Sequence, residues 1–418
     1  MSPELQHVAL LFVLFILPKA LQRLRLPSAI TSFVIGAVCG LGHFAVNAVF
    51  GTSYSTGLFA HDPTVEQLGT LGIVALFLFA GLEIDLDDLR MGATPIATHL
   101  VARAALLAIV AFVLHRLLNV PLRPALVIAL ALLTPSTGFI IDSIHQLPLN
   151  QNEKYWIKTK AIASELLALG VLFIVLKSDT PAGFAFSTVA LIAMAVIVPW
   201  AFKQFAKRVL PYAPKSEFAF LLIMATLCAF ATKALGVYYL VGAFIVGIAA
   251  QRLRETLPSL SSESLLHAIE LFASFFIPFY FFKAGLHLQL ADFSLKALLA
   301  GSIFVFALLP IRLLAILLQR RIAFSELAQK GLRIGVPMLP TLVFTLVLVG
   351  ILREQFGGDV PAYYFGGLVI YTITNTLIPG FALRQPATTD FEHPHILPPD
   401  PAMAAALESE RKKPPEAS

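Results

Sequence analysis

"LLTPSTGF", residues 132–139, interrupts an apolar run with a proline, a glycine and three hydroxyl side chains. Pro135 removes one amide donor and strains the preceding turn, while Thr134, Ser136 and Thr137 can satisfy the carbonyl groups that the break frees. The stretch therefore predicts a helix that is broken within a membrane.

A second interruption of the same kind lies at "GVPMLPTL", residues 335–342, which carries Pro337 and Pro340 together with Gly335 and Thr341. Interrupted helices at corresponding positions of two halves are typical of a transporter site, because exposed backbone oxygens can replace the hydration shell of an ion. The alternative is a pair of ordinary proline kinks, which membrane helices tolerate.

The composition places both interruptions in a membrane. Hydrophobic residues make up 58% of the chain, charged residues 13%, and the mean hydropathy is +0.82, whereas soluble domains carry about 25% charged residues. We expect an all-α polytopic protein with about thirteen transmembrane helices, each long enough for a hydrocarbon core of about 30 Å. The predicted spans are 7–21, 28–42, 66–84, 94–115, 124–145, 157–177, 184–203, 217–234, 237–251, 264–286, 292–318, 327–351 and 361–382.

The sequence contains an internal repeat. "FLFAGLEIDLDDL" (77–89) resembles "YFFKAGLHLQLADF" (280–293), and "SFVIGAV" (32–38) resembles "AFIVGIA" (243–249) at a similar separation. Two related halves joined by a single helix would lie in opposite orientations, the inverted-repeat plan of secondary transporters. Within an exchanger domain of residues 1–383, we expect a first repeat at 7–177, a linking helix at 184–203 and a second repeat at 217–382.

Basic residues indicate the orientation. Lys and Arg favour cytoplasmic loops, and most of them fall on the side that holds the C-terminus, so the N-terminus is expected outside. This bias accounts for the net charge of +5 without a nucleic-acid partner. Residues 384–418 lack an apolar face and are expected to form a disordered cytoplasmic tail. The tail's "HPH" (393–395) has no third ligand nearby, so we expect no resident metal or other cofactor.

Glu165 is the main candidate for the transport site. It stands in the apolar run "AIASELLALGVLFIVL" (161–176), about eight residues into its span and hence ~12 Å from one surface at 1.5 Å per residue. An ionised side chain at this depth costs roughly 3 kcal/mol or more, so it usually faces a water-filled path or a partner. One carboxyl group can hold a proton or a cation, which would let the two compete.

Other residues are assigned around Glu165. Ser164, Thr134, Ser136 and Thr137 are expected to supply neutral oxygen ligands. Arg312, which stays charged, is either a counter-ion for Glu165 or part of a fixed salt bridge.

A further group of residues has two alternative roles. Asp142 and Lys283 could belong to an ion path, or Asp142 could be a solvated helix-end acid and Lys283 could reach the surface along its stem. Arg103 and Lys160 are expected to reach the surface in the same way.

The sequence resembles a known family over roughly residues 7–383. "RLRLPSAITSFVIGAVCG" (23–40), "LGTLGIVALFLFAGLEIDLDDLR" (68–90), "LTPSTGFIIDSI" (133–144), "KALGVYYLVGAFIVGIAAQ" (233–251) and "FYFFKAGLHL" (279–288) are similar to successive helices of the monovalent cation:proton antiporter-2 family. This family includes sodium and potassium antiporters of bacterial inner membranes. The resemblance implies two crossing broken helices in a core domain that moves against a dimerisation domain.

The resemblance also implies which residues act. The family's polar–acid pair in the sixth span corresponds to Ser164-Glu165, and the Lys of its eleventh span corresponds to Arg312. Its twelfth span often carries an Arg-Gly-Glu-like stretch, where this chain has Leu339-Pro340-Thr341. Regulation through the family's nucleotide-binding domain is not expected within this chain. We expect a homodimeric inner-membrane transporter rather than an enzyme, which exchanges H⁺ for Na⁺ or K⁺ without moving net charge. The alternatives are a non-transporting ion or pH sensor and an organic-anion symporter.

Overall fold

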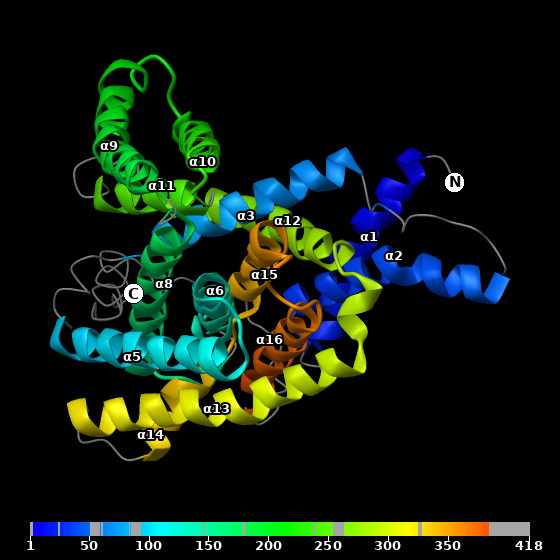
Figure 1. Ribbon diagram of the computed structural model, residues 1–418. Helices are drawn as coiled ribbons and strands as arrows, with labels where there is room; N and C mark the ends of the chain where they lie inside the picture. Colours follow the sequence, from blue (N-terminus) through cyan, green and yellow to red (C-terminus); the bar gives the residue numbers. More distant parts are fainter. Residues whose placement is uncertain are drawn as a thin grey trace, which may run out of the picture. The chain divides into compact units, whose positions relative to one another are not determined.

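The computed structural model describes residues 3–23, 26–50, 59, 62–82, 84, 93–144, 147–177, 180–237, 240–253, 263–324 and 328–383. These residues form helices and connecting segments, with no strand in the described ranges (Figure 1). The predicted disordered tail at 384–418, including the histidines at 393 and 395, lies outside them.

The helices follow the predicted apolar runs. Their bounds are α1 Pro3–Gln22, α2 Ser28–Phe50, α3 Pro63–Leu82, α5 Ala93–Leu117, α6 Leu122–Leu133, α7 Thr137–Ile144, α8 Gln151–Lys177, α9 Pro181–Arg208, α10 Glu217–Ala234, α11 Leu240–Leu253, α12 Glu263–Leu286, η2 Leu290–Phe293, α13 Leu295–Phe324, α14 Ala328–Gly335, η3 Val336–Met338, α15 Leu342–Phe356 and α16 Tyr363–Ala382.

The described residues contain fewer helices of full membrane length than the thirteen predicted spans. Among the described residues, ten helices are long and apolar enough to cross a membrane, and the bent pair Lys330–Met338 and Leu342–Phe356 makes an eleventh. The two remaining predicted spans correspond to shorter apolar helices, Ser28–Phe44 and Leu240–Leu253. The prediction of an all-α polytopic protein is confirmed.

The helices pack in two groups. The scaffold helices, α1, α2, α3, α10, α11 and α12, contact one another, and the core helices, α5 to α8 and α13 to α16, do the same. Helix α9, the predicted linking helix, contacts α8 in the core and α10 and α11 in the scaffold. Figure 1 shows α13 running beside α16, with α5 nearby. Each group therefore takes helices from both predicted repeats.

Glycines place the repeated motifs in equivalent contacts. A Cβ on Gly36 of α2 would lie 2.0 Å from the Phe282 carbonyl oxygen of α12, and one on Gly285 would lie 2.1 Å from the Phe33 carbonyl oxygen of α2. In the same way, Cβ atoms on Gly81 of α3 and Gly247 of α11 would meet each other's backbone. The alignment of the two repeats pairs Gly36 with Gly247 and Gly81 with Gly285. The two crossings are thus counterparts, as related halves require, while the repeat boundaries stay predictions.

Both predicted interruptions are breaks in the helical backbone. Helix α6 ends at Leu133 and α7 begins at Thr137, while the second break separates η3 from α15, which are bent by 40°. The Ser136 amide donates to the Pro340 carbonyl oxygen at 2.8 Å. The two breaks therefore meet, and the crossing lies within the core helices.

Candidate functional site

Glu165 lies in α8 beside the crossing of the two breaks, and 3% of its surface is exposed. Its carboxyl group faces the backbone amide and the hydroxyl of Thr137, the first residue of α7. The partial positive charge of a helix N-terminus favours an anion there. The fold thus brings the predicted acid to the first break, although α7, a connecting segment and the first half of α8 lie between them in the chain.

Three oxygens at this place have no hydrogen-bond partner. Ser136 Oγ, Thr137 Oγ1 and Glu165 Oε2 are all buried, and none has a partner at hydrogen-bonding distance and angle, although the Thr137 hydroxyl faces the carboxyl group. Buried polar atoms in native proteins are almost always paired. Thr134, also predicted as a ligand, is buried in the same extended segment, where its amide donates to the Leu130 carbonyl oxygen. The first break therefore presents oxygens that remain available to a cation or a proton.

The second break satisfies its own polar groups. Asn375 of α16 accepts from the Thr341 amide at 3.2 Å and donates to Thr341 Oγ1 at 3.0 Å. Thr345 Oγ1 donates to the Ala131 carbonyl oxygen at 2.7 Å, and the hydroxyls of Thr341 and Thr372 lie 3.0 Å apart. The unpaired oxygens thus gather at the first break, while the second fixes the crossing.

Two arginines bind the carbonyl ends of the broken helices. Arg312 of α13 donates to the Met338 and Leu339 carbonyl oxygens and to the Tyr371 hydroxyl, each at 2.9 Å. Arg103 of α5 donates to the Leu133 carbonyl oxygen at the end of α6. A guanidinium beside the last carbonyls of a helix complements its partial negative charge. These contacts fit a structural role for Arg312, and its role as a counter-ion for Glu165 stays a prediction.

Two basic side chains do not reach the surface. We expected Arg103 and Lys160 to extend toward the surface, but their exposed fractions are 7% and 0%. Lys160 Nζ donates to Gln319 Oε1 at 2.5 Å, and Gln319 Nε2 donates to the Pro95 carbonyl oxygen at 3.2 Å. The surface expectation is wrong for both residues because internal oxygens replace water as their acceptors.

Ser164 makes contacts that the sequence did not indicate. Its hydroxyl donates to the Lys160 carbonyl oxygen at 2.8 Å, and His99 Nε2 of α5 lies 3.0 Å from Ser164 Oγ. Both side chains are buried. Ser164 therefore joins α8 to α5 directly beside Glu165.

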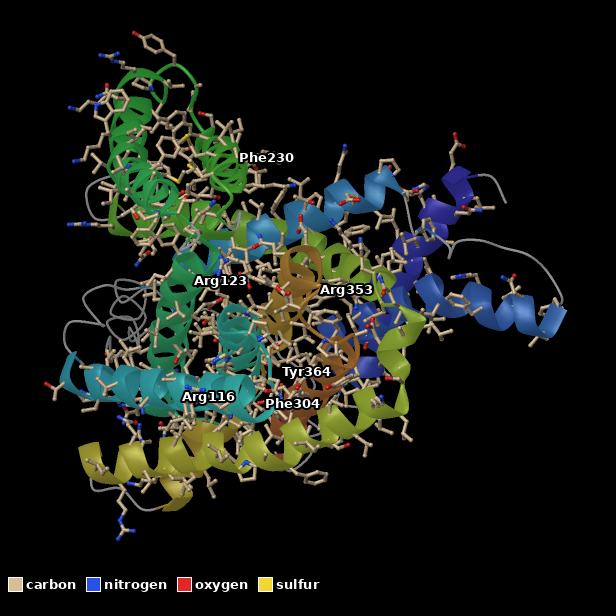
Figure 2. The ribbon with its side chains drawn as sticks, in the orientation of Figure 1. Arg116, Arg123, Phe230, Phe304, Arg353 and Tyr364 are labelled. Atoms are coloured by element: carbon tan, nitrogen blue, oxygen red, sulfur yellow. The ribbon has the colours of Figure 1, made fainter. Side chains whose placement is uncertain are left out.

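A cavity of about 650 Å³ lies beside the C-terminal end of α8. It is lined by Leu176 of α8 and by Lys283 and Arg353, among others. Lys283 pairs with Glu66 at 2.8 Å, and Arg353, labelled in Figure 2, donates to both oxygens of Asp292 at 2.8 and 2.7 Å. Lys283 thus lines the cavity, and its role in an ion path stays a prediction. Asp142 belongs to α7, but its side chain lies outside the described residues.

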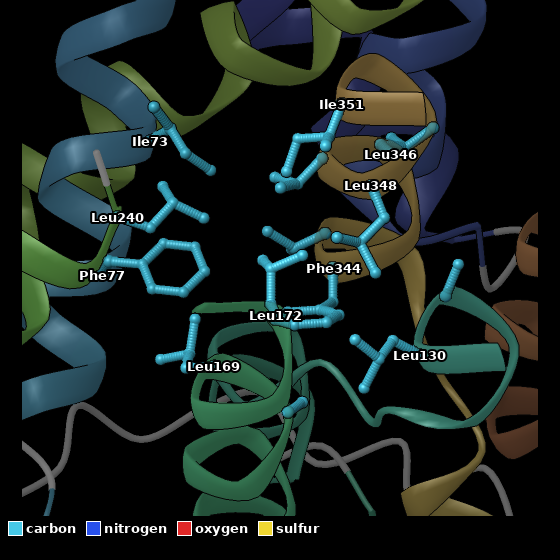
Figure 3. Close-up of a cluster of buried hydrophobic side chains, with 14 of the residues drawn as sticks. Ile73, Phe77, Leu130, Leu169, Leu172, Leu240, Phe344, Leu346, Leu348 and Ile351 are labelled. Atoms are coloured by element: carbon cyan, nitrogen blue, oxygen red, sulfur yellow. The ribbon is translucent and has the colours of Figure 1, made fainter. Parts of the chain in front are cut away.

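Apolar side chains stand between Glu165 and the cavity-lining Leu176 along α8. Leu169, Leu172 and Leu176 follow Glu165 on one face of α8 at intervals of four, three and four residues, which is helical spacing. Leu169 and Leu172 are buried, and Figure 3 shows them with Phe344 of α15 and, from the scaffold, Phe77 and Leu240. We call these five residues the apolar layer.

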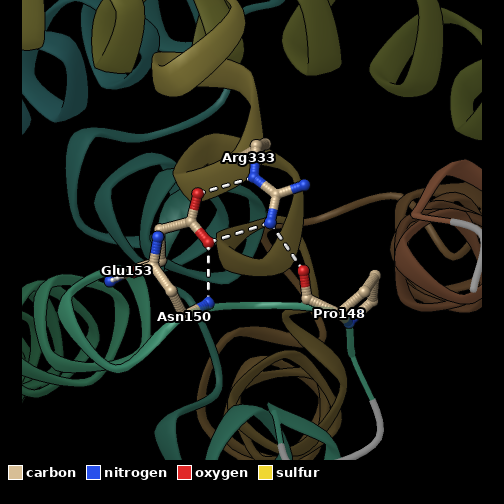
Figure 4. Close-up of polar contacts among 4 residues, drawn as sticks. All are labelled: Pro148, Asn150, Glu153 and Arg333. Carbon is tan, nitrogen blue, oxygen red and sulfur yellow. Dashed lines mark hydrogen bonds and ion pairs between the residues drawn. The ribbon is translucent and has the colours of Figure 1, made fainter.

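The opposite end of α8 is tied to the second broken helix. Arg333 of α14 donates through Nε to Glu153 Oε1 at 2.6 Å and through Nη2 to Glu153 Oε2 at 2.9 Å (Figure 4). The same Nη2 reaches the Pro148 carbonyl oxygen at 2.5 Å, and the Asn150 amide donates to Glu153. A two-point arginine–carboxylate contact fixes orientation as well as distance, so α8 and α14 are held together.

Comparison with known proteins decides the family. Residues 8–388 match the family described as sodium/hydrogen exchanger, transmembrane. The chain belongs to this family. It is 26% identical over 412 residues to the Na⁺/H⁺ antiporter NhaS5 of Synechocystis sp. (strain ATCC 27184 / PCC 6803 / Kazusa). That match covers 90% of this chain and 52% of the relative, so the chain spans about half the relative's length.

Solved structures of the exchanger type share the fold. The sodium proton antiporter MjNhaP1 from Methanocaldococcus jannaschii at pH 8 has a TM-score of 0.63 at 14% identity, covering 91% of this chain and 95% of that one. An electron-microscopy map of the same antiporter gives 0.63 at 15% identity, with 91% and 96% covered. The predicted resemblance to monovalent cation:proton antiporters is thus confirmed.

Membership in the exchanger family leaves the site to be read from this chain's own residues. The structure places Glu165 against Thr137, which belongs to the first break together with Thr134 and Ser136. It joins Ser164 to α5 through His99 and places Arg312 at the second break. Sequence reasoning missed His99 and the capping role of Arg103. Both stand in "THLVARAALL" (98–107), and their spacing of four residues on one helical face was the available signal.

Proposed function

We propose that the protein is a secondary active antiporter that exchanges protons for Na⁺ or K⁺ at the carboxyl group of Glu165. The observation that supports this most directly is the buried Glu165 Oε2 without a partner, beside the unpaired hydroxyls of Ser136 and Thr137. Carboxylate and hydroxyl oxygens can replace the water around a hard monovalent cation. When the cation leaves, a proton can neutralise the same carboxylate, so the two would share the site in turn.

The two packing groups supply a route to each side of the membrane. In the conformation described, the apolar layer closes Glu165 off from the cavity that Lys283 and Arg353 line. Movement of the core helices against the scaffold would carry Glu165, together with Leu169, Leu172 and Phe344 of the core, past Phe77 and Leu240 of the scaffold. The bonds of Arg312, Arg103 and Arg333 lie within the core, so they would travel with it.

The cellular setting follows the same proposal. We place the protein in a bacterial inner membrane with its N-terminus outside and its C-terminus in the cytoplasm, as the distribution of Lys and Arg favours. The scaffold helices would form the contact between two copies of the chain in a homodimer. The transported Na⁺ or K⁺ and H⁺ are substrates, and no further cofactor enters the cycle.

Transport by the purified protein tests the proposal. The full chain in liposomes with an internal pH-sensitive dye is expected to move protons when Na⁺ or K⁺ is added outside, with Li⁺ as a third cation. If none of these cations causes proton movement at pH values from about 6 to about 9, tested about one unit apart, the non-transporting sensor is favoured. Uptake of an organic anion together with a cation would favour the symporter instead.

Exchange is expected to be electroneutral. One carboxylate holds one proton or one monovalent cation, and Arg103 and Arg312 do not release protons at working pH. Each cycle then moves no net charge, so a membrane potential, worth about 2.3 kcal/mol per charge per 100 mV, should not drive it. Liposomes with an imposed potential and no ion gradients should show no cation-dependent proton movement.

Exchange would not be one for one if any of three further residues carried a second proton. Asp142 and Glu83 are acids of the first predicted repeat, and Lys160 is a buried amine five residues from Glu165. Potential-driven proton movement that requires the added cation would refute one-for-one exchange. Its loss in Asp142→Asn, Glu83→Gln or Lys160→Met would then identify the second carrier.

A further inference from the structure

The contact between His99 and Ser164 fixes the direction of a hydroxyl at the site. Ser164 Oγ uses its only proton in the bond to the Lys160 carbonyl oxygen at 2.8 Å. His99 Nε2 lies 3.0 Å from Ser164 Oγ, and because the serine proton is already used, the imidazole is the donor in this contact. A serine hydroxyl has one proton and two lone pairs. Both bonds together leave one lone pair and hold the hydroxyl in a single orientation.

This arrangement keeps Ser164 from bonding to its neighbour Glu165. A hydroxyl with its proton committed elsewhere cannot donate to a carboxylate, and Glu165 Oε2 indeed has no partner. Without His99, the Ser164 hydroxyl would lose one of the two contacts that hold it. It could then rotate away from its present position.

Helix packing holds the backbones of His99 and Ser164 in place. Helix α5 contacts both α8 and α6, and His99 stands one turn before Arg103, which caps the last carbonyl of α6. One face of α5 therefore holds both sides of the site: the end of the first broken helix through Arg103 and the polar residue of α8 through His99. The charged groups that face His99 are Arg103 and Lys160.

We propose that His99 is a positioning residue that aims the Ser164 oxygen at the transported cation and thereby sets the preference between Na⁺ and K⁺. The proposal rests on the exchange function proposed above. Oxygens held at fixed positions suit one ionic radius better than another, whereas a hydroxyl free to rotate adapts to either. Loss of His99 should therefore weaken binding of the preferred cation more than binding of the other cation.

Half-maximal cation concentrations in liposomes test this role. In His99→Ala, the value for the preferred cation should rise about fivefold, which corresponds to one hydrogen bond, while that for the other cation changes less than twofold. His99→Gln, which retains an N–H donor, should recover most of the difference. His115→Ala is the matched control, because His115 lies on the same helix and bonds to the Val120 carbonyl oxygen away from the site.

Ser164→Ala separates positioning from general damage to the fold. If His99 acts through the Ser164 hydroxyl, His99→Ala should have no further effect on cation preference in the Ser164→Ala background. Equal effects of His99→Ala on both cations, or full additivity of the two changes, would overturn the proposal. If His99→Ala does not fold, His99→Gln compared with His99→Leu decides, and equal preference in those two variants would also overturn it. Absence of exchange in the wild-type protein would instead reject the proposed function.

Discussion

Replacing Glu165 by glutamine is expected to abolish cation-dependent proton movement while leaving the protein folded. The amide keeps the size of the side chain and can bond to the Thr137 hydroxyl, which faces position 165. It cannot bind or release a proton at working pH, and it offers a cation no charge. Dye-based assays in liposomes should show a loss of at least about a hundredfold, as is common when a transport or catalytic acid is removed.

Two variants make this expectation specific. Glu165→Asp keeps the charge and should retain measurable exchange with a changed cation affinity. Glu354→Gln makes the same chemical change in a residue that lines the cavity beyond the apolar layer, and it should exchange at close to the wild-type rate. Wild-type exchange in Glu165→Gln would remove this residue from the site.

Replacing Gly36 by alanine should prevent the scaffold from assembling in its present form. The added Cβ would lie 2.0 Å from the Phe282 carbonyl oxygen, and the obstacle is backbone rather than a flexible side chain. Helices α2 and α12 must separate to accept it. Overpacking costs about 1–3 kcal/mol and more where the backbone has to move, so the thermal midpoint in detergent should fall by about 10 °C or more.

The same helix offers the control. Nothing lies within 4 Å of a Cβ on Gly42, so Gly42→Ala should leave the midpoint unchanged or raise it, since alanine favours a helix by about 0.5–1 kcal/mol over glycine. Gly285→Ala, the counterpart on α12, should reproduce the Gly36→Ala loss. Equal midpoints for Gly36→Ala and Gly42→Ala would show that the helices do not cross this closely.

The architecture could be predicted because the physical constraint is strong. Apolar runs of membrane length specify helices, and proline followed by small polar residues specifies where a helix breaks, as at Pro135 and Pro340. The repeat was readable because close crossings admit only glycine at positions such as Gly36 and Gly285. Glu165 could be predicted because an ionised carboxylate in a membrane-spanning apolar run is costly and usually faces a water-filled path or a partner.

The partners of the buried basic residues could not be predicted in the same way. In a uniformly apolar helix, sequence spacing does not distinguish the face that meets lipid from the face that meets protein. Arg103 and Lys160 could therefore reach either water or internal oxygens, and only the packing of α5, α6 and α13 decides for the latter. His99 was missed for the same reason, because its partner Ser164 lies 65 residues away in the chain.

The apolar layer has a consequence for the electrical tightness of the membrane. Together with Leu176, which lines the cavity, its residues on α8 extend over seven residues from Leu169, or ~10 Å along the helix axis at 1.5 Å per residue. A bare ion entering such a medium loses its hydration at a cost of tens of kcal/mol by simple solvation estimates. We therefore expect no ion leak through the protein in this conformation. A cell could thus hold many copies without draining the voltage across its membrane.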